Sequence, residues 1–130
     1  MSNPQQKTLP SRLASRYPEV QQALDARPPS KNRQVATRIV LWAAREAGLN
    51  RDDLLGALAK KDPALFDALC AEMEEQQFRL FERADTLHLS FFNKARVYSA
   101  SAWLARDVPH EAIYESMFAT DSALVLADFL

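Results

Sequence analysis

Glycine is almost absent from this chain, because only Gly48 and Gly56 occur among its 130 residues. Average usage of about 7% would give roughly nine glycines in a chain of this length. Glycine supplies the positive φ angles that tight turns, bulges and phosphate-binding loops require. A chain with so few has few β-hairpins and no glycine-rich nucleotide loop. The sequence therefore predicts an all-α protein whose helices are joined by short polar connections.

Capping residues and apolar spacing predict about six helices in one compact bundle or short helical stack. Pro10 and Ser11 open a short helical stretch, and a helix over about 18–26 ends at the two prolines that follow it. The next helix is expected to run from a cap at Ser30 to Ala47, with Gly48 just past its end. The remaining predicted helices begin at Asn50, at Asp62 (to about 85), at Ser90 (to about 106), at Pro109 and at Asp121.

The length fits one domain, which we place at residues 11–130, after a polar tail at 1–10 that we expect to be flexible. A faint repeat relates residues 32–65 to residues 93–124 at offsets of 61 and then 59 positions. It suggests two similar helical units. The alternative is that shared caps and apolar spacing produce the match by chance.

Charge is distributed unevenly along the chain, although the formal net charge is only −1. Residues 1–45 carry a net charge of +6, residues 46–86 carry −5 and residues 87–130 carry −2. Clustered cations bind phosphates by releasing counterions, so the basic head is a candidate surface for nucleic acid or a protein partner. The alternative is a solvated face, or one that pairs with the acidic middle of the chain itself. The candidate residues are Arg12, Arg16, Arg27, Lys31, Arg33, Arg38, Arg45 and Arg51.

The segment from Ala44 to Ala57 resembles the helix-turn-helix of bacterial DNA-binding regulators. That pattern has a small residue four positions before the turn glycine and an aliphatic residue six positions after it, as Ala44, Gly48 and Leu54 do here. The resemblance implies a turn at Gly48 and a following helix that contacts DNA. The alternative is a plain helical hairpin with a glycine turn.

Two adjacent phenylalanines suggest an interface in the second half of the chain. Neighbouring residues of a helix point about 100° apart, so Phe91 and Phe92 can both be covered only at a crowded junction or against a partner. The apolar C-terminal stretch should likewise dock on the core or on another subunit, which leaves a homodimer as one assembly. The expected interface residues are Phe91, Phe92, Tyr98 and Phe129.

Residues that carry chemistry are few, with two histidines and one cysteine. We find no nucleotide-loop, HExxH, CxxC or GxSxG motif, so we expect no catalytic residue, metal or cofactor. Asp85 and His88 have the spacing of di-metal bundles, but a second His-bearing copy of that motif is missing, and an exposed acidic face explains the pair. Cys70, among leucines and a methionine, is predicted to be a core residue.

The single cysteine, the lack of a signal peptide and the lack of an apolar stretch of about 20 residues predict a cytoplasmic protein without a membrane span. Taken together, these patterns favour a non-catalytic helical interaction protein, such as a small subunit, an inhibitor or a regulator, that binds a macromolecular partner. The alternative is a helix-turn-helix-like regulator that binds DNA or RNA through its basic N-terminal half.

Overall fold

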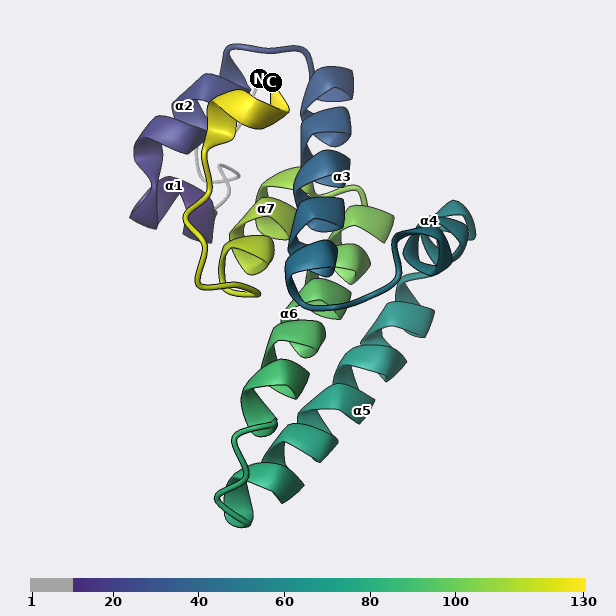
Figure 1. Ribbon diagram of the computed structural model, residues 1–130. Coiled ribbons are helices and arrows are strands. Elements are labelled where there is room, and N and C mark those ends of the chain that lie inside the picture. The colour runs from purple at the N-terminus through teal and green to yellow at the C-terminus, as the bar shows by residue number, and fades with distance from the viewer. Residues whose placement is uncertain (1–10) are drawn as a thin grey trace, which may run out of the picture.

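The computed structural model describes residues 11–130, and this part of the chain is all-helical, without a strand (Figure 1). The predicted all-α class is therefore confirmed, while the predicted flexible tail at 1–10 lies outside the described residues. The elements are α1 (Arg12–Arg16), α2 (Pro18–Asp25), α3 (Pro29–Glu46), α4 (Arg51–Ala59), α5 (Pro63–Glu82), α6 (His88–Ala105), α7 (Pro109–Met117) and a short 3₁₀ turn, η2 (Leu126–Phe129).

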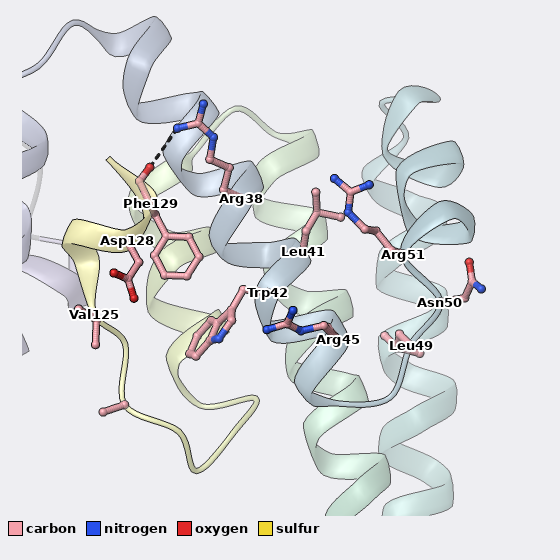
Figure 2. Close-up of a pocket in the computed structure, with 11 residues that line it drawn as sticks. Arg38, Leu41, Trp42, Arg45, Leu49, Asn50, Arg51, Val125, Asp128 and Phe129 are labelled. Atoms are coloured by element: carbon pink, nitrogen blue, oxygen red, sulfur yellow. Dashed lines mark hydrogen bonds between the residues drawn. The ribbon is translucent and has the colours of Figure 1, made fainter.

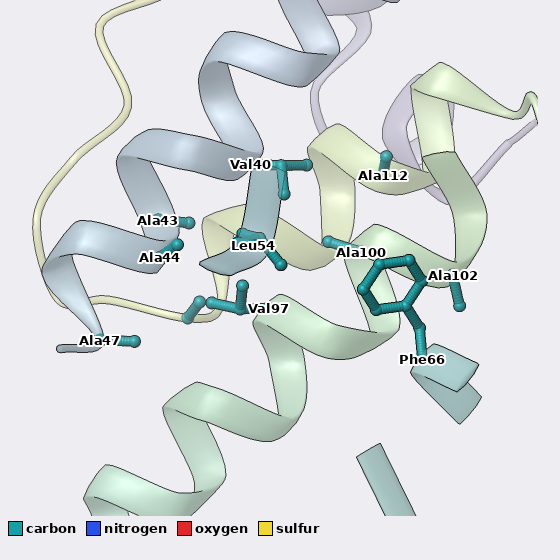
Figure 3. Packing of buried hydrophobic residues seen from close by; sticks show 11 residues of the cluster. Val40, Ala43, Ala44, Ala47, Leu54, Phe66, Val97, Ala100, Ala102 and Ala112 are labelled. Carbon is teal, nitrogen blue, oxygen red and sulfur yellow. The ribbon is translucent and has the colours of Figure 1, made fainter. Parts of the chain in front are cut away.

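Helix α3 is central and packs against α7, α6 and α4 (Figure 1). One apolar cluster joins α1, α2, α3 and α7, and it contains Leu24, Ile39 and Ile113. The other joins α3 to α4, α5 and α6, and it consists largely of alanines with Val40, Leu54 and Val97 (Figure 3). Phe66 is its one aromatic member among the fully covered side chains and the largest of them. Small residues let these helices approach closely, so a single large side chain fills much of the remaining space.

Helices α5 and α6 form a long antiparallel hairpin that projects away from the rest of the molecule (Figure 1). Only its root, near Phe66 and Val97, reaches the apolar cluster on α3. We call residues 75–95, beyond that root, the distal arm. None of the helices in the described part combines the length and the apolar character that crossing a membrane requires.

The caps expected at Asn50 and Asp62 are present, and Ser11, which was expected to open the first helical stretch, caps α1. The side chains of Ser11, Asn50 and Asp62 each accept a hydrogen bond from a backbone N–H in the first turn of the helix that follows, at 3.0, 2.9 and 3.1 Å. These bonds satisfy donors that a helix start otherwise leaves unpaired. Prolines at 18, 63 and 109 each occupy the first position of a helix, as expected.

Three other expected helix starts were wrong. Helix α3 begins at Pro29, one residue before Ser30, because proline needs no hydrogen-bond partner at a first helical position. Helix α6 begins at His88 and not after Ser90, since the Asp85 side chain accepts the Leu87 N–H at 2.9 Å and ends the connection there. No α-helix begins at Asp121, and the one regular element after it is the four-residue η2. Residues 120–125 are non-helical, and Ser122 donates to Glu46 on α3 at 2.6 Å.

The possible internal repeat stays a prediction. Helices α3 and α6 both have 18 residues, and α4 and α7 both have nine, as two equivalent units would. The third elements differ, however, because the 20-residue α5 corresponds to a C-terminal segment whose only regular element is η2.

The two glycines should respond oppositely to alanine. Gly48 has φ +82°, and its N–H and that of Leu49 bond back to the Arg45 and Ala44 carbonyls at 3.1 and 2.9 Å. This is a Schellman-type helix end. Alanine there should lower the free energy of unfolding by about 1 kcal/mol, because a Cβ disfavours this left-handed conformation. Gly56 lies inside α4 with open space around it, so alanine should raise stability by about 0.5–1 kcal/mol. Urea denaturation of both variants checks the sign of each change, and changes of the same sign would contradict it.

Candidate functional site

The structure separates the eight predicted basic residues into three groups. Arg12 and Arg33 are bound to the protein's own acids, with 2.7 Å from Arg12 to Glu111 and 2.8 Å from Arg33 to Asp107. Arg16, Arg27 and Lys31 are exposed on α1, after α2 and at the start of α3. The remaining three predicted residues, Arg38, Arg45 and Arg51, line one hollow.

That hollow, which we call the arginine groove, has a volume of about 690 Å³ and lies between α3, the start of α4 and the C-terminal segment (Figure 2). Arg38 donates to the Phe129 carbonyl oxygen at 3.1 Å. Arg45 and Arg51 form no ion pair with any residue in the described part of the chain. The groove is lined by Arg38, Leu41, Trp42, Arg45, Leu49, Asn50, Arg51, Ala123, Val125, Asp128 and Phe129.

The segment that resembles a helix-turn-helix has the expected turn. Gly48 takes the positive φ, and Ala44 and Leu54 are buried in the same apolar cluster. The first turn of α4, however, carries two exposed carboxylates, Asp52 and Asp53. Carboxylates there repel the phosphates of a duplex, so this geometry does not favour α4 as a DNA-reading helix.

The four predicted interface residues do not form one surface. Phe92 is exposed on the distal arm, and Phe91 is half-buried beside Lys94. Tyr98 packs against the main apolar cluster, and burial raises the pKa of its hydroxyl. Phe129 contacts Trp42 edge-on in the arginine groove, with ring centroids 5.7 Å apart.

Phe92 instead belongs to a group of exposed apolar side chains on the distal arm. Phe78 is 64% exposed, Phe81 62%, Leu89 57% and Phe92 36%, and Leu87 at the tip is 59% exposed. We call Phe78, Phe81, Leu89 and Phe92 the aromatic face. Of these four residues, only Phe92 was expected from the sequence to lie at an interface.

Two contacts across the hairpin fix how these residues face each other. Arg96 on α6 pairs with Glu74 on α5 at 3.1 Å, and the Phe81 ring meets the His88 ring at 5.2 Å between centroids. One helical turn beyond Glu74 and Arg96, Phe78 therefore lies opposite Phe92. Phe81 and Leu89 follow at the next turn. Residues three and four apart share a helix side, so all four lie on the side of the hairpin that carries Arg96.

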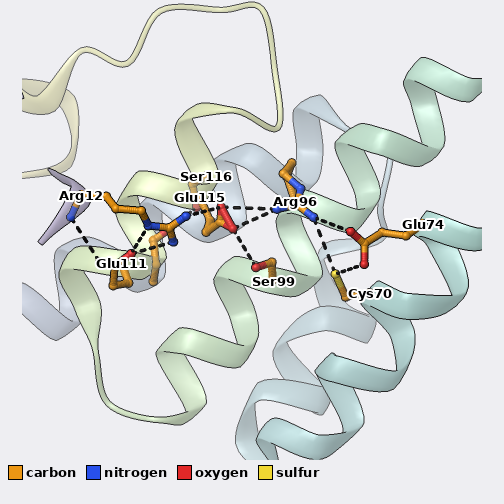
Figure 4. Close-up of polar contacts among 9 residues, drawn as sticks. Arg12, Cys70, Glu74, Arg96, Ser99, Glu111, Glu115 and Ser116 are labelled. Carbon is orange, nitrogen blue, oxygen red and sulfur yellow. Dashed lines mark hydrogen bonds and ion pairs between the residues drawn. The ribbon is translucent and has the colours of Figure 1, made fainter. Parts of the chain in front are cut away.

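Helix α7 covers this side of the hairpin only near its root. Glu115 of α7 accepts hydrogen bonds from Arg96 at 3.0 Å and from Ser99 at 2.9 Å (Figure 4). Because α7 ends at Met117, it does not extend along the distal arm. The aromatic face therefore continues the side of the hairpin that α7 covers, beyond the point where α7 ends.

Glu115 and Arg96 together connect four helices, α1, α5, α6 and α7 (Figure 4). The Glu115 side chain is only 6% exposed, and it also lies 3.8 Å from Arg12 of α1. Arg96 reaches on to Glu74 and lies 3.9 Å from the Cys70 sulfur. These contacts hold the hairpin in place against α7.

Cys70 is half-buried and free, and not the fully covered core residue that we expected. Burial and the neighbouring Glu74 carboxylate raise the pKa of its thiol to about 11, although Arg96 acts in the opposite direction. The thiol therefore stays protonated at neutral pH, and a protonated thiol is a poor nucleophile.

Among residues 11–130, no three histidine, cysteine or acidic side chains gather as metal ligands would. Comparison of the chain with protein-family models, with curated proteins and with solved structures gives no match. The two surfaces that remain as functional candidates are the aromatic face and the arginine groove.

Proposed function

We propose that this is a non-catalytic interaction protein, a small subunit or regulator that binds a protein partner through its aromatic face. The observation that carries the proposal is the exposure of Phe78, Phe81, Leu89 and Phe92 on a projecting hairpin. Apolar patches of this kind on a monomer are commonly interaction sites. Near the root of the hairpin, the carboxylates of Glu74 and Glu115 are held in ion pairs with Arg96, which supports a structural role for them.

The partner that the area and charge favour is a second copy of this chain. At roughly 200 Å² for a phenylalanine side chain, the exposed parts of the three phenylalanines amount to about 300 Å². With Leu87 and Leu89, two facing copies would bury about 1,000 Å² in total, the lower bound of a specific interface. The distal arm carries three basic and three acidic residues, so two arms do not repel each other through net charge.

Sedimentation velocity over 1–100 µM tests this pairing. We expect the wild-type chain to shift toward dimer with concentration, and a Phe78→Ser/Phe92→Ser variant to remain monomeric, since each copy would lose two apolar contacts. Phe78 is 64% exposed, so its replacement should change the free energy of unfolding by less than about 0.5 kcal/mol. Phe92 is 36% exposed and lies under the Arg96 guanidinium, which is 5.7 Å from the centroid of its ring, so its replacement should cost about 1 kcal/mol and leave the fold intact.

Val125→Ser is the matched control, because Val125 is 55% exposed but lies in the arginine groove and outside the arm. It should dimerise like the wild type. A wild-type chain that stays monomeric at 100 µM excludes the second copy as the partner. In that case, affinity purification from the native host compares the same three proteins. A protein that co-purifies with the wild type and the control, but not with the Phe78/Phe92 variant, would support an interaction function for the aromatic face. Equal recovery with all three would contradict it.

A further inference from the structure

The arginine groove concentrates positive charge that the protein itself does not neutralise. Three arginines line it against one carboxylate, Asp128. Arg38 donates one of its five N–H groups to the Phe129 carbonyl oxygen, and Arg45 and Arg51 form no ion pair with a described residue. Guanidinium groups bind phosphates through paired, charge-assisted hydrogen bonds. The polar half of the groove thus suits an anion such as a phosphate.

The other half of the groove is apolar and aromatic. Trp42, Leu41 and Leu49 line it from α3 and the turn after α3, and Phe129 contacts Trp42 from the C-terminal segment. In Figure 2, Arg45 extends toward Trp42, and Arg51 reaches from α4 toward Leu41. A positively charged groove that also presents aromatic rings is the usual way to hold a nucleotide, with the base stacked and the phosphate paired.

The volume of the groove and the charges around it further limit which ligands can bind there. A volume of about 690 Å³ lies in the range of about 300–1,000 Å³ typical of small-ligand sites. Arg38 and Arg45 are seven residues apart on α3, which separates them by about 10 Å along the helix axis. Asp52 and Asp53 follow Arg51 directly and are exposed, so they would oppose the second strand of a duplex.

We propose that the arginine groove binds a nucleotide unit, either free or within a single strand, with its base against Trp42 and its phosphates on the arginines that line the groove. This site lies apart from the aromatic face and does not depend on the function proposed for that face. It also differs from what the helix-turn-helix resemblance implies, because α4 does not read a duplex here. The groove itself, at the junction of α3, α4 and the C-terminal segment, is the binding element.

Tryptophan fluorescence tests the proposal directly. The chain has two tryptophans, so a Trp103→Phe background leaves Trp42 as the reporter. The titrants are ATP, a 12-nucleotide single-stranded adenine RNA, a 12-base-pair DNA duplex and a polyglutamate peptide, at 50 and 200 mM salt. We expect ATP or the RNA to quench Trp42, with the duplex and the peptide at least tenfold weaker. For two or three neutralised phosphates of a single strand, affinity should fall roughly tenfold between the two salt concentrations.

Charge reversal at the groove is compared with the same reversal elsewhere. Arg45→Glu/Arg51→Glu should weaken binding at least tenfold, whereas Arg16→Glu/Arg27→Glu should weaken it less than threefold. All four arginines are exposed, so the fold should survive, which circular dichroism checks. Quenching by ATP alone identifies a free nucleotide as the ligand, and quenching by RNA alone identifies a strand.

Four results would overturn the proposal. They are no quenching by ATP or RNA at 50 mM salt, polyglutamate binding as tight as RNA binding, duplex binding as tight as RNA binding, and equal losses in the two charge-reversal variants. None of them changes the dimerisation expected from the aromatic face, so the two proposals fail separately.

Discussion

Replacing Glu115 with alanine is expected to lower the free energy of unfolding by about 3 kcal/mol, the lower end of the cost of breaking a buried ion pair. The carboxylate is 6% exposed and accepts hydrogen bonds from Arg96 and Ser99. Without it, the Arg96 guanidinium, itself only 20% exposed, keeps Glu74 as its one carboxylate partner. The remaining charge would be poorly solvated where α6 meets α7. Urea denaturation followed by circular dichroism measures the change.

Glu74→Ala is the matched control, because Glu74 pairs with the same arginine from a position that is 46% exposed. Its removal should cost less than about 1 kcal/mol, as for other solvent-screened pairs. Replacing Arg96 and Glu115 together with Met and Leu should recover much of the stability, because no uncompensated charge then remains. Equal losses in Glu115→Ala and Glu74→Ala would show that the Glu115 pair is not the buried one.

Local sequence signals predicted most of the helices. Asn50 and Asp62 cap the helices that were expected to follow them, and Gly48 takes the positive φ of a helix end. Such signals depend on residues one to four positions apart, so they can be read without knowing the tertiary structure. Ser90 and Asp121 failed because a competing partner was present. Asp85 fixes the turn before α6, and Glu46 on α3 binds the segment after Asp121.

The arginine groove was predictable only in part. The charge imbalance of the first 45 residues pointed to Arg38 and Arg45, and Arg51 was added from the next helix. Sequence could not separate these from Arg12 and Arg33, because their acidic partners, Glu111 and Asp107, lie more than 70 positions away. Trp42 could not be assigned to the site from sequence, because it lines the groove only where the C-terminal segment folds over α3.

The aromatic face could not be predicted from the sequence for a different reason. Phe78 and Phe81 have ordinary helical spacing, so their sequence pattern is the same as that of a buried stripe. Their exposure results from a length difference, since α5 and α6 have 20 and 18 residues whereas the covering α7 has nine. No local pattern reports which part of a long hairpin another helix will cover.

The largest loss of stability is expected for Phe66→Ala, at about 3–5 kcal/mol. Phe66 is fully buried, and it is the one buried side chain of α5. It belongs to an apolar cluster made largely of alanines of α3, α6 and α7, which are too small to close the cavity left by a phenyl ring. A loss of this size is a large part of the 5–15 kcal/mol that stabilises a typical domain. Phe66→Leu, expected to cost roughly 1.5 kcal/mol, keeps the measurement possible if the alanine variant does not fold.

Phe78→Ala provides the comparison on the same helix, because Phe78 is 64% exposed and should cost less than about 0.5 kcal/mol. The two phenylalanines thus separate the two roles of α5, since Phe66 fixes the root of the hairpin and Phe78 belongs to its uncovered face. Amide hydrogen exchange in Phe66→Leu should rise first at the root of α5 and in α4, and less along the distal arm. Equal stability losses for Phe66→Ala and Phe78→Ala would mean that Phe66 does not fix the root of the hairpin in the apolar cluster. The hairpin would then not be held at a fixed angle, and the aromatic face would not be presented as a rigid docking surface.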